Sequence, residues 1–312
     1  MWLLAILALL TGCAPRTAKL TLDRDDTGLV EFTTAGSLVA TDDGRLTAGP
    51  PLTLSGDLEI PPGPGPFPAV VLMHGCAGIG SADREWVSVL RTAGYATFVL
   101  DSFTGRGLSD VCVDAGALYP SQRMPDAYGA LRILSTHPAI DPSRIALMGF
   151  SHGGIATVLS STQWAHDRFV EPGRPGFRAF IAFYPYCNWS FPEMERISAP
   201  LRIYSGSLDD WTPAQPCELL VERLRVTGYD AAITVYAGAR HSFDRAGPPI
   251  RPLPRVLNAA ACAPRLTSIL GPMENGDQLA SCLHEGATVG SNPQAAAEAR
   301  RAVLREFGAL LR

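Results

Sequence analysis

The chain has 312 residues, which is long enough to bury a large core in a single domain. Hydrophobic residues make up 46% and charged residues 18%, a composition that excludes extended disorder and indicates a globular protein. The formal net charge is −4 and no basic cluster occurs, so nucleic acid is not an expected partner.

The chain begins with a short apolar segment that is similar to a signal peptide. Residues 1–10 are apolar but too few to cross a bilayer as a helix. Leu10-Thr11-Gly12-Cys13 then resembles the bacterial lipobox, in which Cys13 carries lipid and becomes the first mature residue. We therefore expect a lipoprotein-type signal peptide at 1–12, a tether at 13–26, and anchoring at a periplasm-facing membrane. Ala14 rather than Asp follows Cys13, and the resemblance to sorted lipoproteins then favours the outer membrane. No Lys or Arg precedes the apolar run, so plain secretion and a fortuitous apolar start stay open.

Residues 27–312 predict one α/β domain with an insertion at 245–291. Apolar segments alternate with amphipathic ones, which is typical of right-handed βαβ units and a mostly parallel twisted sheet with helices on both faces. Ser81 is expected to cap the first helix, and Thr212, followed by Pro213, to cap a later one. The expected strands are 28–34, 51–60, 69–73, 96–100, 145–148, 179–183, 201–204 and 231–235, the first two antiparallel; the expected helices are 81–93, 123–134, one beginning near 213, and 295–311.

A glycine-rich loop, His74-Gly75-Cys76-Ala77-Gly78, follows the buried strand at 69–73. A loop of this kind can aim a backbone N–H at a developing oxyanion, and we assign that donor to Cys76. Phosphate binding is the other common use of such a loop. The chain has no G-x-x-x-x-G-K-[ST] sequence and this loop has no Lys, so a nucleotide is not expected.

The sequence Gly149-Phe150-Ser151-His152-Gly153 matches the G-x-S-x-G pattern of a nucleophile elbow. It follows the apolar run at 145–148 and precedes small and apolar residues, as a turn between a strand and a helix requires. The pattern is weak by itself because Gly and Ser are common. Its partners lie downstream, in the order Ser…Asp…His that is typical of the α/β-hydrolase fold. We expect Ser151 to be the nucleophile and the N–H of His152 to be the second oxyanion donor.

The expected acid and base follow the next strands. Asp209 and Asp210 lie in the turn between the strand at 201–204 and a helix, where the carboxyl ends of parallel strands meet ligands. We prefer Asp209 as the acid; the alternative is that the pair merely favours the helix dipole. His241 lies in a loop after the strand at 231–235, where its near-neutral titration suits a general base. A solvated loop histidine is the alternative.

Seven cysteines leave six after Cys13, which permits three disulfides with fifteen connectivities in an exported protein. The six are Cys76, Cys112, Cys187, Cys217, Cys262 and Cys282, and the alternative is that all are reduced. No zinc-type spacing occurs, so no structural metal is expected. The insertion at 245–291 carries no pattern of regular structure, and we expect a flap beside the active site, pinned by a Cys262–Cys282 bridge. Packing on the far side is the alternative.

Several segments between residues 50 and 245 together resemble the dienelactone hydrolase family. The founding members carry a cysteine nucleophile where this chain has Ser151, and a glutamate in the oxyanion loop where it has Gly75. The resemblance implies the α/β-hydrolase fold, a triad and ester chemistry. The segments are VVLMHGC (70–76), DSFTGRG (101–107), DAYGAL (126–131), DPSRI (141–145), FYPYC (183–187), DDWTP (209–213) and YAGARHSF (236–243).

The sequence therefore predicts a serine hydrolase of small-molecule esters or lactones that needs no cofactor. Ser151, His241 and Asp209 would carry out acyl transfer through an acyl-enzyme. Arg106 is a candidate for binding a substrate carboxylate, with a salt bridge that holds its loop as the alternative. Two other functions stay open: a serine peptidase on the same fold, and a non-catalytic surface binding lipoprotein.

Overall fold

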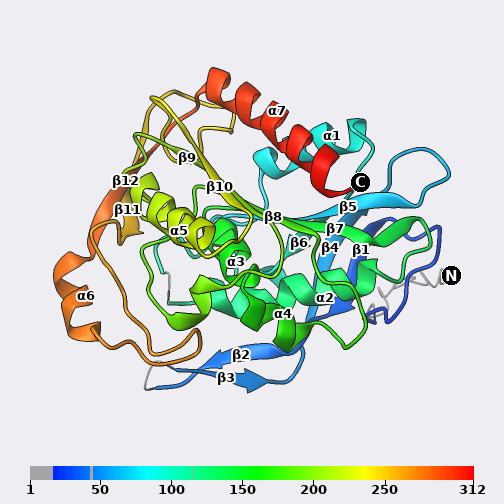
Figure 1. Cartoon of the computed structure of the whole chain (residues 1–312), viewed down its shortest axis with the longest axis horizontal. Coiled ribbons are helices and arrows are strands. Elements are labelled where there is room, and N and C mark those ends of the chain that lie inside the picture. Colours follow the sequence, from blue (N-terminus) through cyan, green and yellow to red (C-terminus); the bar gives the residue numbers. More distant parts are fainter. Residues whose placement is uncertain (1–16, 43–44, 115) are drawn as a thin grey trace, which may run out of the picture.

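The core of the protein is a twisted eight-stranded sheet in the order β1-β4-β6-β5-β7-β8-β9-β10 (Figure 1). This computed structural model describes residues 17–42, 45–114 and 116–312. β1 and β4 pair antiparallel, β4 pairs antiparallel with β6, and the remaining pairings are parallel. The strands are β1 (Gly28–Thr33), β4 (Thr53–Glu59), β5 (Phe67–Met73), β6 (Ala96–Asp101), β7 (Ile140–Phe150), β8 (Ala179–Phe183), β9 (Leu201–Gly206) and β10 (Ala231–Tyr236).

Helices cover both faces of the sheet. On β5, Val70 and Leu72 point to the face covered by α1 and α7, whereas Val71 and Met73 point to the face covered by α2, α3 and α5. The predicted α/β class, with a mostly parallel sheet between two helical layers, is therefore confirmed. The helices are α1 (Ser81–Thr92), α2 (Met124–Leu134), α3 (His152–Ser160), α4 (Gln163–Phe169), α5 (Ala214–Val226) and α7 (Pro293–Leu310), with short 3-10 turns η1 (Thr104–Arg106), η2 (Pro120–Arg123) and η3 (Pro192–Glu195).

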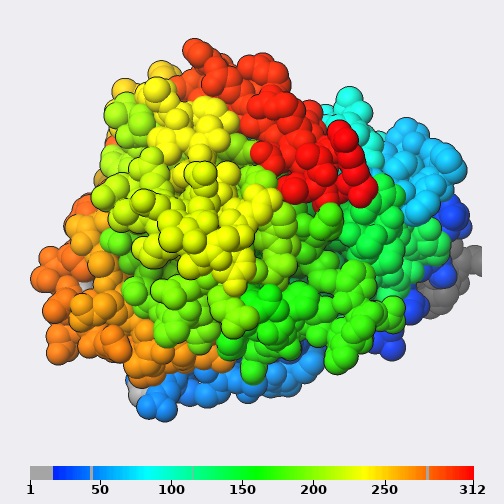
Figure 2. Space-filling model, in the orientation of Figure 1, coloured from blue at the N-terminus to red at the C-terminus, as the bar shows by residue number. Residues whose placement is uncertain are grey.

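The prediction that 245–291 lacks regular structure is wrong. The segment contains β11 (Arg251–Asn258) and β12 (His284–Val289), which pair antiparallel, and the short helix α6 (Gly276–Cys282). A second pair of short strands, β2 (Ser37–Ala40) and β3 (Leu46–Gly49), was also not predicted. The backbone N–H of Leu46 donates to the carbonyl of Leu270 (3.0 Å), which joins this pair to the insertion. Figure 2 shows the two segments meeting at the lower edge of the molecule.

Two helix starts differ from the prediction. Gly80, not Ser81, is the N-cap of α1, and the carboxylate of Asp83 accepts the Gly80 N–H (2.7 Å). Pro213, not Thr212, is the N-cap of α5. The hydroxyl of Thr212 is used elsewhere, in the site described below.

All six cysteines of the domain are paired. The bridges are Cys76–Cys112, Cys187–Cys217 and Cys262–Cys282. The predicted bridge within the insertion is therefore confirmed, and the reduced alternative is wrong.

The predicted signal peptide at 1–12 and the lipidated Cys13 lie outside the described residues. The described part of the predicted tether contacts the domain: Leu22 is buried and its N–H donates to Thr136 Oγ1 (2.9 Å). Among residues 17–42, 45–114 and 116–312, no helix combines the length and apolar character needed to cross a bilayer.

Candidate active site

Ser151 lies in a sharp turn between β7 and α3. Its backbone has φ 52° and ψ −116°, a conformation that L-residues rarely adopt and that is typical of strained functional turns. The flanking glycines explain how the turn fits. A Cβ on Gly149 would lie 2.2 Å from the Gly153 carbonyl oxygen, and one on Gly153 would lie 2.2 Å from the Met73 carbonyl oxygen. The elbow geometry expected from G-x-S-x-G is therefore present.

Ser151, His241 and Asp209 form a continuous hydrogen-bonded chain. His241 Nε2 lies 2.9 Å from Ser151 Oγ, and His241 Nδ1 lies 2.9 Å from Asp209 Oδ2. The side chains of His241 and Asp209 are almost fully buried. This geometry matches a nucleophile, a base and an orienting acid held in reach of one another.

Asp209 is held by its own turn. Its Oδ1 accepts the backbone N–H groups of Trp211 (3.0 Å) and Thr212 (2.8 Å). The Thr212 hydroxyl lies 3.0 Å from both Asp209 Oδ2 and His241 Nδ1, and 2.9 Å from the Tyr184 carbonyl oxygen. The sequence predicts that this hydroxyl caps a helix, and it does not reveal the contacts of Thr212 with Asp209 and His241.

Asp210, the neighbouring candidate, does not contact His241. Its side chain is exposed, and Oδ1 accepts the backbone N–H of Thr288 in β12 (2.8 Å). Its carbonyl oxygen accepts from Asn258 Nδ2 (3.0 Å) at the end of β11. Asp210 thus connects the turn that contains Asp209 to the insertion at 245–291.

The two expected oxyanion donors lie beside Ser151. Cys76 and His152 line the same cavity as Ser151, and the Cys76–Cys112 bridge holds the loop that carries Cys76. The imidazole of His152 is not suited to act as a general acid or base at neutral pH. Burial and the charge of Arg123 lower its pKa to about 3, so the ring is neutral at pH 7.

Arg123 is a buried cation that the sequence pattern did not reveal. Its Nη1 lies 2.9 Å from the His74 carbonyl oxygen, to which it donates, and 3.0 Å from His152 Nδ1. Because His152 Nδ1 accepts this bond, Nε2 carries the proton and donates to the Leu118 carbonyl oxygen (3.0 Å). Burial lowers the pKa of Arg123 to about 10, which leaves it charged at neutral pH.

Arg106 lies apart from this cavity. Its guanidinium makes a two-pronged ion pair with Asp126, at 2.9 and 2.8 Å, and donates to the Ser102 carbonyl oxygen. The salt bridge weighed as the alternative role is therefore present. A contact with a substrate carboxylate stays a prediction.

The catalytic cavity has a volume of about 380 Å³. Aromatic and aliphatic side chains dominate its wall, including Trp189, Trp211 and Ile155, and the insertion contributes Leu257 and Met273 among others. None of the described residues that line it carries a formal charge at neutral pH. The insertion therefore lies beside the active site, as expected of a flap, and its far-side alternative is wrong.

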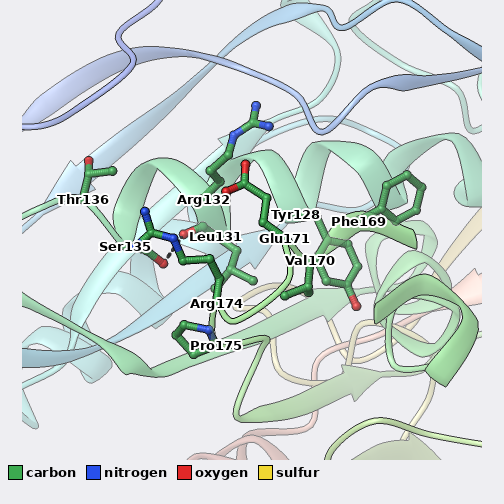
Figure 3. A pocket seen from close by; sticks show the side chains of 10 residues that line it. All are labelled: Tyr128, Leu131, Arg132, Ser135, Thr136, Phe169, Val170, Glu171, Arg174 and Pro175. Atoms are coloured by element: carbon green, nitrogen blue, oxygen red, sulfur yellow. Dashed lines mark hydrogen bonds between the residues drawn. The ribbon is translucent and has the colours of Figure 1, made fainter. Parts of the chain in front are cut away.

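A smaller hollow of about 70 Å³ lies between α2 and the segment after α4 (Figure 3). Figure 3 shows Tyr128 and Phe169 at one end and Arg174 with Ser135 at the other. Ser135 follows α2 and precedes β7, so this hollow lies toward the amino ends of the strands, opposite Ser151. In the part of the chain that the structure describes, no group of three or more His, Cys, Asp or Glu side chains could hold a metal ion.

Comparisons with known proteins found similar sequences and structures. A relative from Bradyrhizobium sp, named "Probable 2-oxo-3-(5-oxofuran-2-ylidene)propanoate lactonase", is 21% identical over 195 residues, which cover 57% of this chain and 74% of the relative. A solved structure from Klebsiella pneumoniae that carries the name dienelactone hydrolase has a TM-score of 0.57 at 16% identity and covers 90% of this chain and 98% of its own. The dienelactone hydrolase-like promiscuous phosphotriesterase P91, from metagenomic libraries, has a TM-score of 0.52 at 17% identity and covers 91% and 100%.

These two structures share the fold with this chain. The dienelactone hydrolase family matches residues 54–309, which is most of the chain. The chain belongs to the dienelactone hydrolase family and is a hydrolase that acts on esters or lactones.

Proposed function

We propose that this hydrolase uses Ser151, His241 and Asp209 as a catalytic triad and forms an acyl-enzyme. The observation that carries the proposal is the unbroken chain from Ser151 Oγ through His241 to the buried carboxylate of Asp209, with both links at 2.9 Å. The carboxylate fixes His241 with its proton on Nδ1, so that Nε2 is free to accept the serine proton.

In the first step, Ser151 Oγ attacks the carbonyl carbon of the ester and its proton passes to His241 Nε2. The backbone N–H groups of Cys76 and His152 donate to the oxyanion that forms. The C–O bond to the alcohol then breaks, and the alkoxide leaves with the proton from His241. Water attacks the acyl-serine by the reverse proton path; with a lactone, the released alcohol stays attached to the acyl group.

The lining of the cavity supports an uncharged substrate. The relative from Bradyrhizobium is named for a propanoate, a lactone that carries a carboxylate. The described wall of the cavity here holds no cation that would pair with a carboxylate, and Arg106 is already paired with Asp126. Burying an unpaired carboxylate is costly, so neutral esters and lactones fit this wall better.

The experiment is activity-based labelling of the purified protein with a fluorophosphonate probe. We expect labelling of the wild type, none of Ser151→Ala, and loss of p-nitrophenyl butyrate hydrolysis in that variant. Ser160→Ala, which changes a buried serine at the end of α3, is the matched control and should still be labelled. Esterase activity that survives in Ser151→Ala contradicts the proposed nucleophile.

A further inference from the structure

A second apolar cavity, of about 310 Å³, lies next to the catalytic one. The residues that line it include Leu46 of β3, Ser121 of η2, Leu159 of α3, and Leu266, Ile269 and Gly276 of the insertion. None of the described residues that line it carries a formal charge. Nothing in the proposed triad chemistry uses this space.

The two cavities share part of their walls. Tyr119, Trp189 and Met273 line both the second cavity and the one that contains Ser151. The volume of each cavity alone is at the lower end of the range for small-molecule sites, and the two volumes together reach its middle. The second cavity is therefore adjacent to the catalytic site, across these three shared side chains.

Hydrogen bonds hold the outer wall of the second cavity to the rest of the domain. The N–H of Leu46 donates to the Leu270 carbonyl (3.0 Å), and the N–H of Ile269 donates to Glu193 Oε2 (3.1 Å). The N–H of Leu266 donates to the Ser190 carbonyl (2.9 Å). These three bonds join the insertion to separate parts of the domain, at β3, at η3 and before η3. The cavity is thus a preformed space.

The position of the second cavity suits the acyl part of an ester better than the alcohol part. The leaving alcohol must receive its proton from His241, whose ring contacts Trp211 (centroids 4.9 Å apart), so the alcohol lies toward that side of the catalytic cavity. The second cavity is lined by α3 and η2, and α3 begins with His152, the expected oxyanion donor. Trp211 lines the catalytic cavity and not the second one, so an acyl chain directed away from the alcohol runs toward the second cavity.

We propose that the second cavity is an acyl subsite, and that the substrates are neutral esters whose acyl chain is long enough to pass between Tyr119, Trp189 and Met273. This proposal rests on the proposed function. Each methylene that enters the second cavity moves from water to an apolar surface. This transfer corresponds to about a fourfold gain in kcat/KM per methylene.

The test is a chain-length series of p-nitrophenyl esters, from acetate to palmitate, with variants that fill the second cavity. A Cβ on Gly276 meets no atom within 4 Å, so the first atom of a larger side chain fits there, and Gly276→Phe adds a ring at a residue that lines the cavity. Gly308 in α7 is equally open, and Gly308→Phe is the matched control. Leu46→Trp, at a half-buried site on β3, narrows the cavity from the other side.

We expect wild-type kcat/KM to rise with acyl length. The ratio of kcat/KM for the best long ester to that for acetate should fall at least tenfold in Gly276→Phe and in Leu46→Trp, and stay unchanged in Gly308→Phe. A parallel series of alkyl acetates, which lengthens the alcohol instead, should show no such difference between Gly276→Phe and Gly308→Phe.

Two results overturn the acyl subsite while leaving the serine mechanism in place. One is a wild type that cleaves acetate but gains nothing from acyl length. The other is a Gly276→Phe variant in which kcat/KM falls for the long alkyl acetates but not for the p-nitrophenyl esters of long acyl chains. If no ester is cleaved in a Ser151-dependent manner, the proposed function fails as well.

Discussion

Asp209 and Asp210 offer a matched pair of neighbouring carboxylates, of which one contacts His241 and the other contacts Thr288. In Asp209→Asn, the buried negative charge beside Nδ1 is lost. When His241 becomes an imidazolium, the two charges lie about 4 Å apart, and their attraction is about 4 kcal/mol at an effective dielectric constant of about 20. Because about 1.4 kcal/mol corresponds to a factor of ten, kcat should fall about a thousandfold.

The assay is steady-state hydrolysis of p-nitrophenyl butyrate at pH 7.5 by wild type, Asp209→Asn and Asp210→Asn. Asparagine keeps an oxygen that can accept from the N–H groups of Trp211 and Thr212, so the turn should persist, and thermal melting checks this. Asp210→Asn should retain kcat within a few-fold of wild type. An Asp209→Asn variant with less than a tenfold loss, or equal losses in both variants, refutes the assignment of the acid.

Three further predictions concern stability and location. Replacing Cys262 and Cys282 together with Ala opens a loop with a sequence separation of 20 and should lower the free energy of unfolding by about 3 kcal/mol in denaturant titrations; an unchanged value contradicts this. Because the pKa of His152 is about 3 in the folded protein and 6.5 when unfolded, the unfolded chain binds the extra proton and the free energy of unfolding falls as the pH drops from 6.5 toward 3. Urea titrations at pH 7.5 and 4.5 should show that the free energy of unfolding falls less between these two pH values in His152→Gln than in wild type. The exposed control His284→Gln should behave as wild type. Metabolic palmitate labelling in a bacterial host should be seen in wild type and lost in Cys13→Ser; an unlabelled, soluble wild type would mean that the lipobox interpretation is wrong.

The residues of the candidate triad could be predicted because their signals are local. The elbow requires glycines on both sides of Ser151, and Asp209 and His241 each follow a strand that the sequence predicts. Parallel strands place their carboxyl ends at one edge, so the order along the chain was enough to expect that these side chains meet.

The surroundings of these residues could not be predicted, because they depend on contacts between distant segments. Thr212 has the sequence context of a helix cap, and its place beside the acid depends on the Tyr184 carbonyl, 28 residues away. Arg123 looked like the start of a helix, and its burial depends on His74 and His152. β11 contains Pro252 and Pro254, which disfavour a strand, and it pairs with β12 across the whole insertion, Arg251 with Val289.

The Cys76–Cys112 bridge lies in the wall of the catalytic cavity, since both residues line it. A small thiol that reduces this bridge through the cavity must enter the same space as an ester. Occupancy of the cavity and reduction of the bridge are therefore competing events, and a bound inhibitor should slow the reduction. Cys187–Cys217, whose two residues are buried, supplies an internal reference rate in the same sample. The redox state of one bridge thus becomes a direct readout of ligand binding, independent of turnover.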